Sequence, residues 1–144
     1  MAEINTNIIL DGITLALRKA FPDSMITSNE VKQGLNVPAF IVRMVSFQTQ
    51  AQPMQRHKNL PRFDIIYFPK ADREECYSVS DKLCKVLEVI ALPSGDKVRG
   101  VDMSSEITDD ALHFFTSYNH FVYAPYYDTT MDELKIKQGE ANEG

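Results

Sequence analysis

A strand that leads directly into an amphipathic helix constrains the fold more than any other feature of the chain. Both elements are predicted within residues 60–90, and residues 63–68 are rich in aromatic and β-branched side chains, as strands are. Pro61 and Pro69 are predicted to bound this strand. A strand joined to a helix through a proline-containing loop is typical of the middle of an α+β domain, so the rest of the chain has to cover the sheet and the inner face of the helix.

The helix carries a start signal and one apolar face. Asp72 can cap the backbone N–H groups of the first turn, and Glu75, three residues on, can reach back as in a capping box. Apolar residues then recur at steps of three and four, which predicts a helix that runs to Ile90 and buries Cys76, Val79, Leu83, Val86, Leu87 and Ile90.

A second helix is predicted near the N-terminus, over residues 4–21. Asn5 or Thr6 can cap it, and Pro22 ends it because proline lacks an N–H group. Gly12 lies inside this helix, where glycine costs about 1 kcal/mol relative to alanine. We therefore expect another part of the backbone to approach the helix closely at Gly12.

The other elements are strands and turns. Strands are predicted at residues 25–27, 39–49, 98–108 and 112–124, the last two as a hairpin across residues 109–111. Residues 92–96 are predicted to form a turn, and residues 29–34 either a turn or a continued strand. The resulting order α-β-β-β-α-β-β predicts an α+β fold: a single mixed or antiparallel sheet of four to five strands with two helices packed on it. Residues 1–137 are predicted to form one domain, and residues 138–144 a disordered tail.

Residues 48–59 are predicted to form a polar loop, because they lack the signature of a tight hairpin turn. Loops of this length inside a domain are usually functional or disordered. The loop holds a basic cluster of Arg56, His57 and Lys58. This cluster is compatible with a site that binds phosphate or an acidic group, but we favour a solvated loop that docks on a partner.

The charge and the cysteines restrict the function classes. A net charge of −5 and a pI near 5.1 argue against a protein held on nucleic acid by phosphate contacts, although a local basic loop is still compatible with these totals. Cys76 and Cys84 lie about 12 Å apart along the predicted helix, too far for a disulfide, so we expect reduced thiols and a cytosolic setting. Neither a signal peptide nor a membrane span is predicted.

Three carboxylates are the main candidates for chemistry. Asp64 lies inside an apolar strand, and Asp102 and Glu106 share a face of a later strand. Together they could bind a divalent ion, which would make the chain a metal-dependent hydrolase. The competing interpretation places the same face at the solvent or at an oligomer interface, and we favour it.

The sequence contains no other catalytic signature. His113 and His120 lie seven residues apart on one predicted strand, so they point to opposite faces and cannot chelate one metal ion. A glycine-rich phosphate loop, a nucleophile elbow and a zinc-binding Cys-His spacing are all missing. We therefore predict no enzymatic activity, no cofactor and no bound metal.

Several short strings resemble a family of phage and prophage proteins of Gram-positive hosts. They are Glu30–Val42, Arg62–Pro69, Glu75–Tyr77, Arg99–Met103, Leu112–Phe115 and Met131–Leu134. The family they resemble is that of the tail terminators of long-tailed phages and phage-tail-like particles, and the resemblance extends over about residues 8 to 137. The chain departs from the pattern of that family by one additional isoleucine in the Phe63–Pro69 string, which could shift the side chain that faces inward.

The resemblance implies a small α+β subunit that forms a homo-hexameric ring in the virion. The ring caps the tail tube at its head-proximal end, stops tube polymerisation and contacts both the tail tube protein and a head-tail connector or stopper. It also implies assembly in the host bacterial cytoplasm, and an acidic lumen would let DNA pass without specific binding. A different neck protein, such as a stopper, is the alternative within the same phage context.

The residues expected at ring or tail interfaces come from the polar loop, the central strand and the C-terminal segment. They are Gln48, Gln50, Gln52, Met54, Arg56, His57, Lys58, Asp64, Met131, Leu134 and Ile136.

Overall fold

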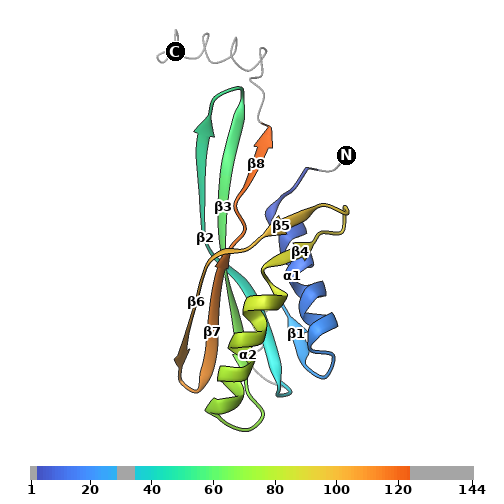
Figure 1. Ribbon diagram of the computed structural model, residues 1–144, viewed down its shortest axis with the longest axis vertical. Coiled ribbons are helices and arrows are strands. Elements are labelled where there is room, and N and C mark those ends of the chain that lie inside the picture. The colour runs from blue at the N-terminus through green and yellow to red at the C-terminus, as the bar shows by residue number, and fades with distance from the viewer. Residues whose placement is uncertain (1–2, 29–34, 124–144) are drawn as a thin grey trace, which may run out of the picture.

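The computed structural model describes residues 3–28 and 35–123 (Figure 1). This part of the chain contains, in order, α1 (Thr6–Ala20), β1 (Met25–Thr27), β2 (Ala39–Gln52), β3 (Arg56–Phe68), α2 (Arg73–Val86), β4 (Val89–Ala91), β5 (Lys97–Arg99), β6 (Val101–Thr108), β7 (Ala111–Ser117) and β8 (His120–Tyr123). The predicted turn at residues 29–34, the segment with Met131, Leu134 and Ile136, and the predicted tail at 138–144 lie outside the described residues.

The main sheet has the strand order β1-β2-β3-β7-β6, and β8 pairs with β3 beyond the end of β7. β1 is parallel to β2, whereas the other neighbouring strands are antiparallel. A separate two-stranded sheet joins β4 and β5. The predicted α+β class, with a mixed sheet and two helices, is confirmed. The sheet has six strands instead of four to five, and the small second sheet was not predicted.

Both helices lie on the same side of the main sheet (Figure 1), and the core fills the space between the helices and the sheet. α1 contributes Ile9, Ile13 and Leu17, and the facing strands contribute mainly Phe40, Val42, Phe63, Ile65, Leu112 and Phe114. Within the described part of the chain, neither helix has the length and hydrophobicity that a membrane-spanning helix needs.

The predicted features of α1 are confirmed. The side chain of Asn5 caps the helix by accepting a hydrogen bond from the Ile8 N–H group at 2.9 Å. Gly12 packs against β4, where a Cβ atom would lie only 2.9 Å from Leu92 Cδ2 and 3.1 Å from the Ala91 carbonyl oxygen. The glycine therefore allows the close backbone approach that its position predicted.

α2 begins as predicted and ends earlier than predicted. Asp72 accepts a hydrogen bond from the Glu75 N–H group at 3.1 Å, which confirms the cap. The helix ends at Val86, and Val89–Ala91 forms β4 instead of a further helical turn. Leu87 and Ile90 are nevertheless buried as expected, because a three-residue spacing keeps both side chains on the core side of the helix-to-strand junction.

Glu75 secures the loop before α2. Its carboxylate accepts hydrogen bonds from the N–H groups of Lys70 at 2.9 Å and Ala71 at 3.0 Å, and from the buried Tyr67 hydroxyl. Burial raises the pKa of the Glu75 carboxyl, but these hydrogen bonds outweigh burial and leave the pKa below its ordinary value. A carboxyl group with a lowered pKa stabilises the fold above its unfolded-state pKa, and this stabilisation is lost as the pH falls through the folded-state pKa.

We therefore expect Glu75→Gln to lower the free energy of unfolding by roughly 1 kcal/mol at neutral pH. The difference from wild type should begin to shrink below about pH 4.3, the ordinary pKa of a glutamate carboxyl, and should disappear once the pH is below the lowered pKa of the folded state, where the wild-type carboxyl is itself protonated. Urea unfolding at several pH values measures both effects. Glu74→Gln, one residue earlier in the same helical turn, is the matched control and should show the smaller effect of the helix dipole alone. An equal effect of both variants at every pH would contradict the role of Glu75.

Two predicted strands are each divided in two. The strand predicted over 98–108 breaks at Gly100 into β5 and β6, because the Gly100 N–H group bonds to the Glu88 carbonyl at 2.7 Å. A Cβ atom at position 100 would lie 2.7 Å from the Leu87 carbonyl oxygen, so the close approach of the chain to the end of α2 requires glycine here. The strand predicted over 112–124 breaks after Ser117 into β7 and β8.

The prediction of a polar loop at residues 48–59 is wrong. β2 continues to Gln52 and β3 begins at Arg56, so this segment is a long antiparallel hairpin with a turn of only three residues. Met54 and Gln55 in the turn have φ values of 65° and 59°, which neither residue type favours, so the sequence carries no turn signature there.

Pro61 lies inside β3 instead of bounding it. Its carbonyl accepts a hydrogen bond from the Tyr118 N–H group at 3.1 Å, so the position of the missing N–H group faces the junction between β7 and β8. Neither strand pairs with Pro61 at this junction, and the absent donor therefore interrupts no ladder.

Candidate assembly surface

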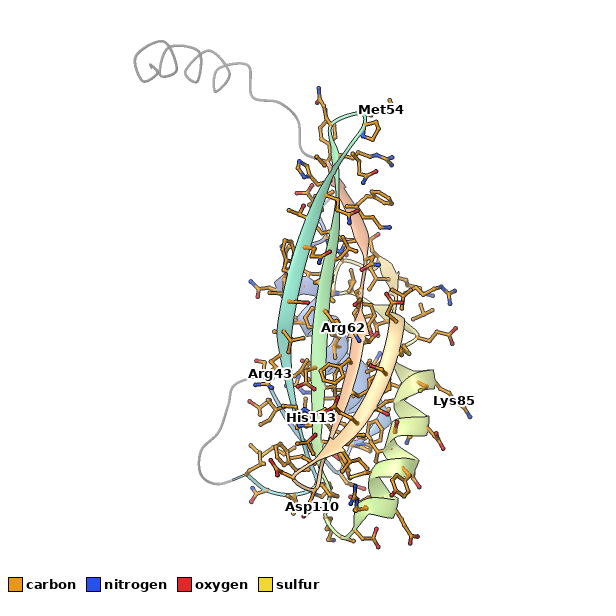
Figure 2. The ribbon with its side chains drawn as sticks, turned by 90° about the vertical axis from the view of Figure 1, so that its left-hand side faces the viewer. Arg43, Met54, Arg62, Lys85, Asp110 and His113 are labelled. Atoms are coloured by element: carbon orange, nitrogen blue, oxygen red, sulfur yellow. The ribbon has the colours of Figure 1, made fainter. Side chains whose placement is uncertain are left out.

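The hairpin of β2 and β3 projects beyond the helices and, with β8, forms a narrow three-stranded extension (Figure 1). We call this extension the blade and define it as residues 46–60 and 120–123. Figure 2 shows Met54 at its tip and Asp110, in the turn between β6 and β7, at the opposite end of the molecule. Met54 is 85% exposed, the highest value among the exposed large apolar side chains of the described chain.

The strand register separates the predicted interface residues onto two faces of the blade. Paired residues share a face, and successive residues alternate. The face continuous with the outer side of the sheet, away from α1 and α2, carries Gln48, Gln50, Gln52, Arg56, Lys58, Leu60, Phe121 and Tyr123. The opposite face, on the side of the helices, carries Phe47, Thr49, Ala51, His57, Asn59, His120 and Val122. His57 is thus separated from its two basic neighbours.

Contacts between side chains hold the strands of the blade together. On the helix side, the Thr49 hydroxyl donates to Asn59 Oδ1 at 2.6 Å. On the outer face, the Arg56 guanidinium lies 4.7 Å from the centre of the Phe121 ring, a cation–π contact. Near the tip, the Tyr123 hydroxyl donates to Gln55 Oε1 at 3.1 Å. The blade therefore presents an organised surface on both sides.

One edge of the blade has no strand partner in the described part of the chain. β1 pairs only with Ala39–Ile41 of β2, so the rest of β2 is bonded on one side only. Met44, Val45 and Phe47 near this edge are each more than 40% exposed. Long unpaired edges with apolar side chains promote association with other chains, and proteins normally cover or protect them.

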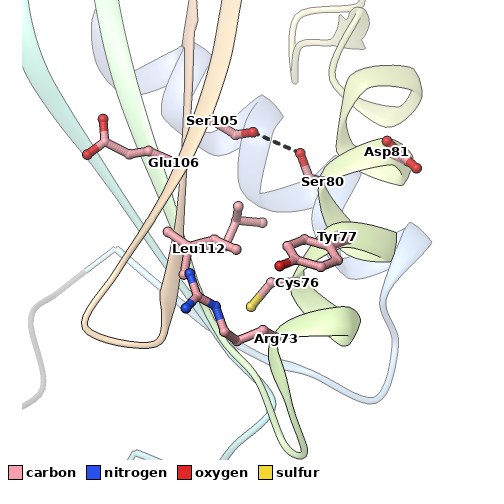
Figure 3. Close-up of a pocket in the computed structure, with 9 residues that line it drawn as sticks. Arg73, Cys76, Tyr77, Ser80, Asp81, Ser105, Glu106 and Leu112 are labelled. Atoms are coloured by element: carbon pink, nitrogen blue, oxygen red, sulfur yellow. Dashed lines mark hydrogen bonds between the residues drawn. The ribbon is translucent and has the colours of Figure 1, made fainter.

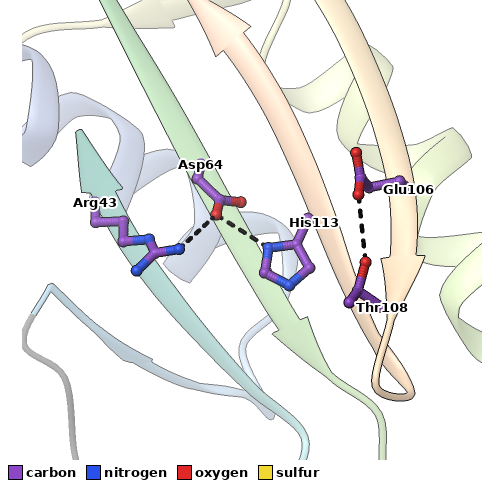
Figure 4. A network of polar contacts seen from close by, with 5 residues as sticks. All are labelled: Arg43, Asp64, Glu106, Thr108 and His113. Carbon is purple, nitrogen blue, oxygen red and sulfur yellow. Dashed lines mark hydrogen bonds and ion pairs between the residues drawn. The ribbon is translucent and has the colours of Figure 1, made fainter. Parts of the chain in front are cut away.

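Below the blade, Asp64 forms a polar cluster on the outer face of the sheet (Figure 4). It is only 1% exposed. Its Oδ2 atom accepts a hydrogen bond from Arg43 Nη2 at 3.2 Å and lies 3.0 Å from His113 Nδ1, while Oδ1 has no partner among the described residues. Asp64 could thus reach a partner only through Arg43 and His113, which are both more exposed.

The three carboxylates considered for metal binding do not form a metal site. Asp64 is paired with Arg43, Asp102 has a φ of 55° where the pairing of β6 with β7 is irregular, and Glu106 accepts a hydrogen bond from Thr108. Among the described residues, no group of three or more His, Cys, Asp and Glu side chains is placed to hold a metal ion.

We expect Arg43→Ala to lower the free energy of unfolding by about 1–3 kcal/mol, because the buried carboxylate of Asp64 then keeps His113 as its single partner. In the Asp64→Asn background the same substitution should cost clearly less, which a double-mutant cycle by urea unfolding measures. Arg43→Lys, which keeps the charge, is the control and should fall between wild type and Arg43→Ala. Equal costs of Arg43→Ala in the two backgrounds would contradict the contact.

The sequence interpretation missed the aromatic residues of the blade. Phe121 and Tyr123 are 50% and 62% exposed and flank the cationic residues of β3 on the outer face. Their alternation with His120 and Val122 was visible in the sequence as a strand pattern. Only the pairing of β8 with β3 shows that they share a face with Arg56 and Lys58.

A family model described as phage tail terminator protein matches residues 8–130, which is most of the chain. A search of curated proteins finds no significant match.

Proposed function

Because the chain belongs to the phage tail terminator family, as its sequence strings predicted, we propose that it forms a hexameric ring that caps the tail tube, ends tube polymerisation and joins the tail to the head-proximal connector. The family is structural and not enzymatic, so the hydrolase alternative is wrong. Membership makes the chain a component of the phage tail that interacts with other tail proteins.

The proposed ring has distinct partners on its two sides. One side binds the tail tube protein, the other binds the connector or stopper, and DNA passes through the lumen without specific binding. The ring assembles in the host bacterial cytoplasm and stays at the head-proximal end of the tail. We also propose that residues 1–137 act as a single domain.

The unpaired edge of β2 is the observation that best supports a ring. The subunit exposes Met44, Val45 and Phe47 beside this edge, and association with a neighbouring copy would remove them from water. A head-to-tail contact of this kind generates a closed ring when its rotation closes.

We propose that the blade makes the contacts with tail partners. Met54, at its exposed tip, is placed to reach the tail tube protein, and Gln48, Gln50 and Gln52 lie along one face behind it. His57 would contact a neighbour on the helix side of the blade, and Asp64 would act through Arg43 and His113. Met131, Leu134 and Ile136, outside the described residues, complete the proposed interface.

Polymerisation of the cognate tail tube protein tests the proposal. We expect addition of the purified chain to stop tube growth, so that tubes imaged by electron microscopy become shorter as the ratio of chain to tube protein rises. An unrelated protein of similar size and charge is the control and should leave tube length unchanged. Tubes of normal length at every ratio would contradict the proposed function.

A further inference from the structure

We propose that the outer face of the blade is a contact site for the phosphate backbone of double-stranded DNA. Its core is Arg56 and Lys58 on β3, with the amide side chains of Gln48, Gln50 and Gln52 beside them on β2. Arg62 continues the cationic row on β3 toward the body of the sheet. The inference goes beyond the proposed cap. That DNA passes this face inside the ring rests on that proposal, and the cationic face departs from the acidic lumen that the family resemblance implies.

The spacing of these side chains matches a phosphate backbone. Residues on one face of an antiparallel strand recur every ~6.8 Å. Neighbouring phosphates of one DNA strand rise by ~3.4 Å along the helix axis and also turn around it, so they lie farther apart than this rise, at about the spacing of side chains on one face of the blade. Arginine, lysine and glutamine side chains are the ordinary donors to phosphate oxygens.

Carboxylates are missing where they would repel a polyanion. The sequence from residue 31 to residue 63 contains no aspartate or glutamate, although the whole chain has a net charge of −5. Among the described residues, the ion pairs with carboxylates involve Arg43, Arg99 and His113, and none involves Arg56, Lys58 or Arg62. The positive charge is therefore local, which the totals for the whole chain conceal.

Side-chain contacts hold Arg56 and Arg62, two of the three cationic groups, in place. The Arg56 guanidinium is positioned over the Phe121 ring, and Arg62 donates to the Asp102 carbonyl at 2.9 Å and to Ser117 Oγ at 3.0 Å. Arg56 lies over the Phe121 ring and the Tyr123 hydroxyl is bonded to Gln55, so both exposed rings of this face are already engaged by side chains of the blade. The surface therefore suits the backbone of a duplex better than a single strand.

A groove between α2 and β6 is a weaker candidate for a ligand site. It measures about 410 Å³, and its lining includes Tyr77, Asp81 and the hydrogen-bonded pair Ser80 and Ser105 (Figure 3). The charged side chains of its lining are Arg73, Asp81 and Glu106, so both signs are present, and no polar atom in the groove is both buried and unpaired in the described chain. The groove therefore points to no particular ligand.

Salt-dependent binding of the full chain to a short labelled DNA duplex tests the inference by fluorescence anisotropy. Each phosphate neutralised contributes about −0.9 to the slope of log K against log salt. We expect wild type to bind at low salt, and the double variant Arg56→Gln/Lys58→Gln to show a slope smaller in magnitude by ~1.8. The matched control, Lys85→Gln/Lys97→Gln, removes the same charge from exposed positions outside the blade and should bind as wild type does.

Three results would overturn the inference: no binding of wild type at low salt, an unchanged slope for the Arg56 and Lys58 variant, or an equal loss in the control. A variant that keeps the wild-type slope and loses only binding to the tail tube protein would assign this face to an acidic protein partner instead. The duplex assay and the tube-growth assay fail independently. A chain that caps tubes and ignores DNA overturns this inference alone, and the opposite result overturns the cap alone.

Discussion

Shortening the blade is expected to abolish tube capping while the subunit stays folded. The change replaces residues 50–58 by an Asn-Gly turn between Thr49 and Asn59, which face each other across the hairpin. It removes the exposed tip at Met54 together with Arg56, His57 and Lys58. None of the buried core residues lies in the deleted segment, so we expect the melting temperature to fall by only about 4 °C, which corresponds to ~1 kcal/mol.

A second variant separates the tip from the length of the blade. Replacing only residues 53–55 by Asn-Gly keeps both strands and removes Met54. If the tip alone contacts the tube, both variants fail to cap; if the faces of the blade also contribute, the second variant caps weakly. Tube length by electron microscopy measures capping, and circular dichroism confirms folding. Normal capping by the folded, fully shortened variant would contradict the role of the blade.

Tyr118→Ala is expected to cause the largest loss of stability, about 3–5 kcal/mol. Tyr118 is fully buried at the junction of β7 and β8. Its hydroxyl donates to the Leu87 carbonyl at the end of α2 at 2.7 Å, and its N–H group donates to the Pro61 carbonyl. Its ring packs near Phe63 with a distance of 6.1 Å between ring centres. One side chain thus joins the base of the blade to the helical layer.

Tyr118→Phe separates the hydrogen bond from the packing. We expect it to cost about 1–2 kcal/mol, because the Leu87 carbonyl then loses a buried donor while the ring still fills its space. Burial raises the pKa of the Tyr118 hydroxyl well above its ordinary value, so the group stays a donor throughout the neutral and mildly basic range. Urea unfolding measures both variants. Equal losses for Tyr118→Ala and Tyr118→Phe would contradict the assignment of most of the stability to packing.

Local signals in the sequence predicted the body of the fold. Asn5 and Asp72 cap helices in the structure because short polar side chains bond to free N–H groups nearby in the chain. Gly12 indicated close packing because only contact with another element explains a glycine within a helix. These features depend on neighbours within a few residues, which a sequence displays directly.

The blade could not be predicted, because its structure depends on distant residues. Its turn has no glycine or asparagine although Met54 and Gln55 adopt positive φ values. Gln48, Gln50 and Gln52 have weak strand propensity, and their strand is held by its pairing with β3. Pro61 falsely indicated a strand boundary, because only the break between β7 and β8, more than fifty residues later, makes proline acceptable there.

The function followed from strings shared with a family and not from a catalytic pattern. Asp64, Asp102 and Glu106 suggested a metal site because the alternation of side chains along the predicted strands was compatible with all three on one face of the sheet. The buried pairing of Asp64 with Arg43 and His113, which come from the two neighbouring strands, was invisible in the local sequence. The charge total likewise hid the carboxylate-free blade, because a sum over the chain does not record position.

Electron microscopy of tail tubes assembled with the purified chain shows directly whether the chain caps the tube ends. We expect a ring of six copies on one end of each tube, with the blade tips directed toward the tube and no copies along its length. A chain that decorates the sides of the tubes, or that is absent from their ends, would contradict it.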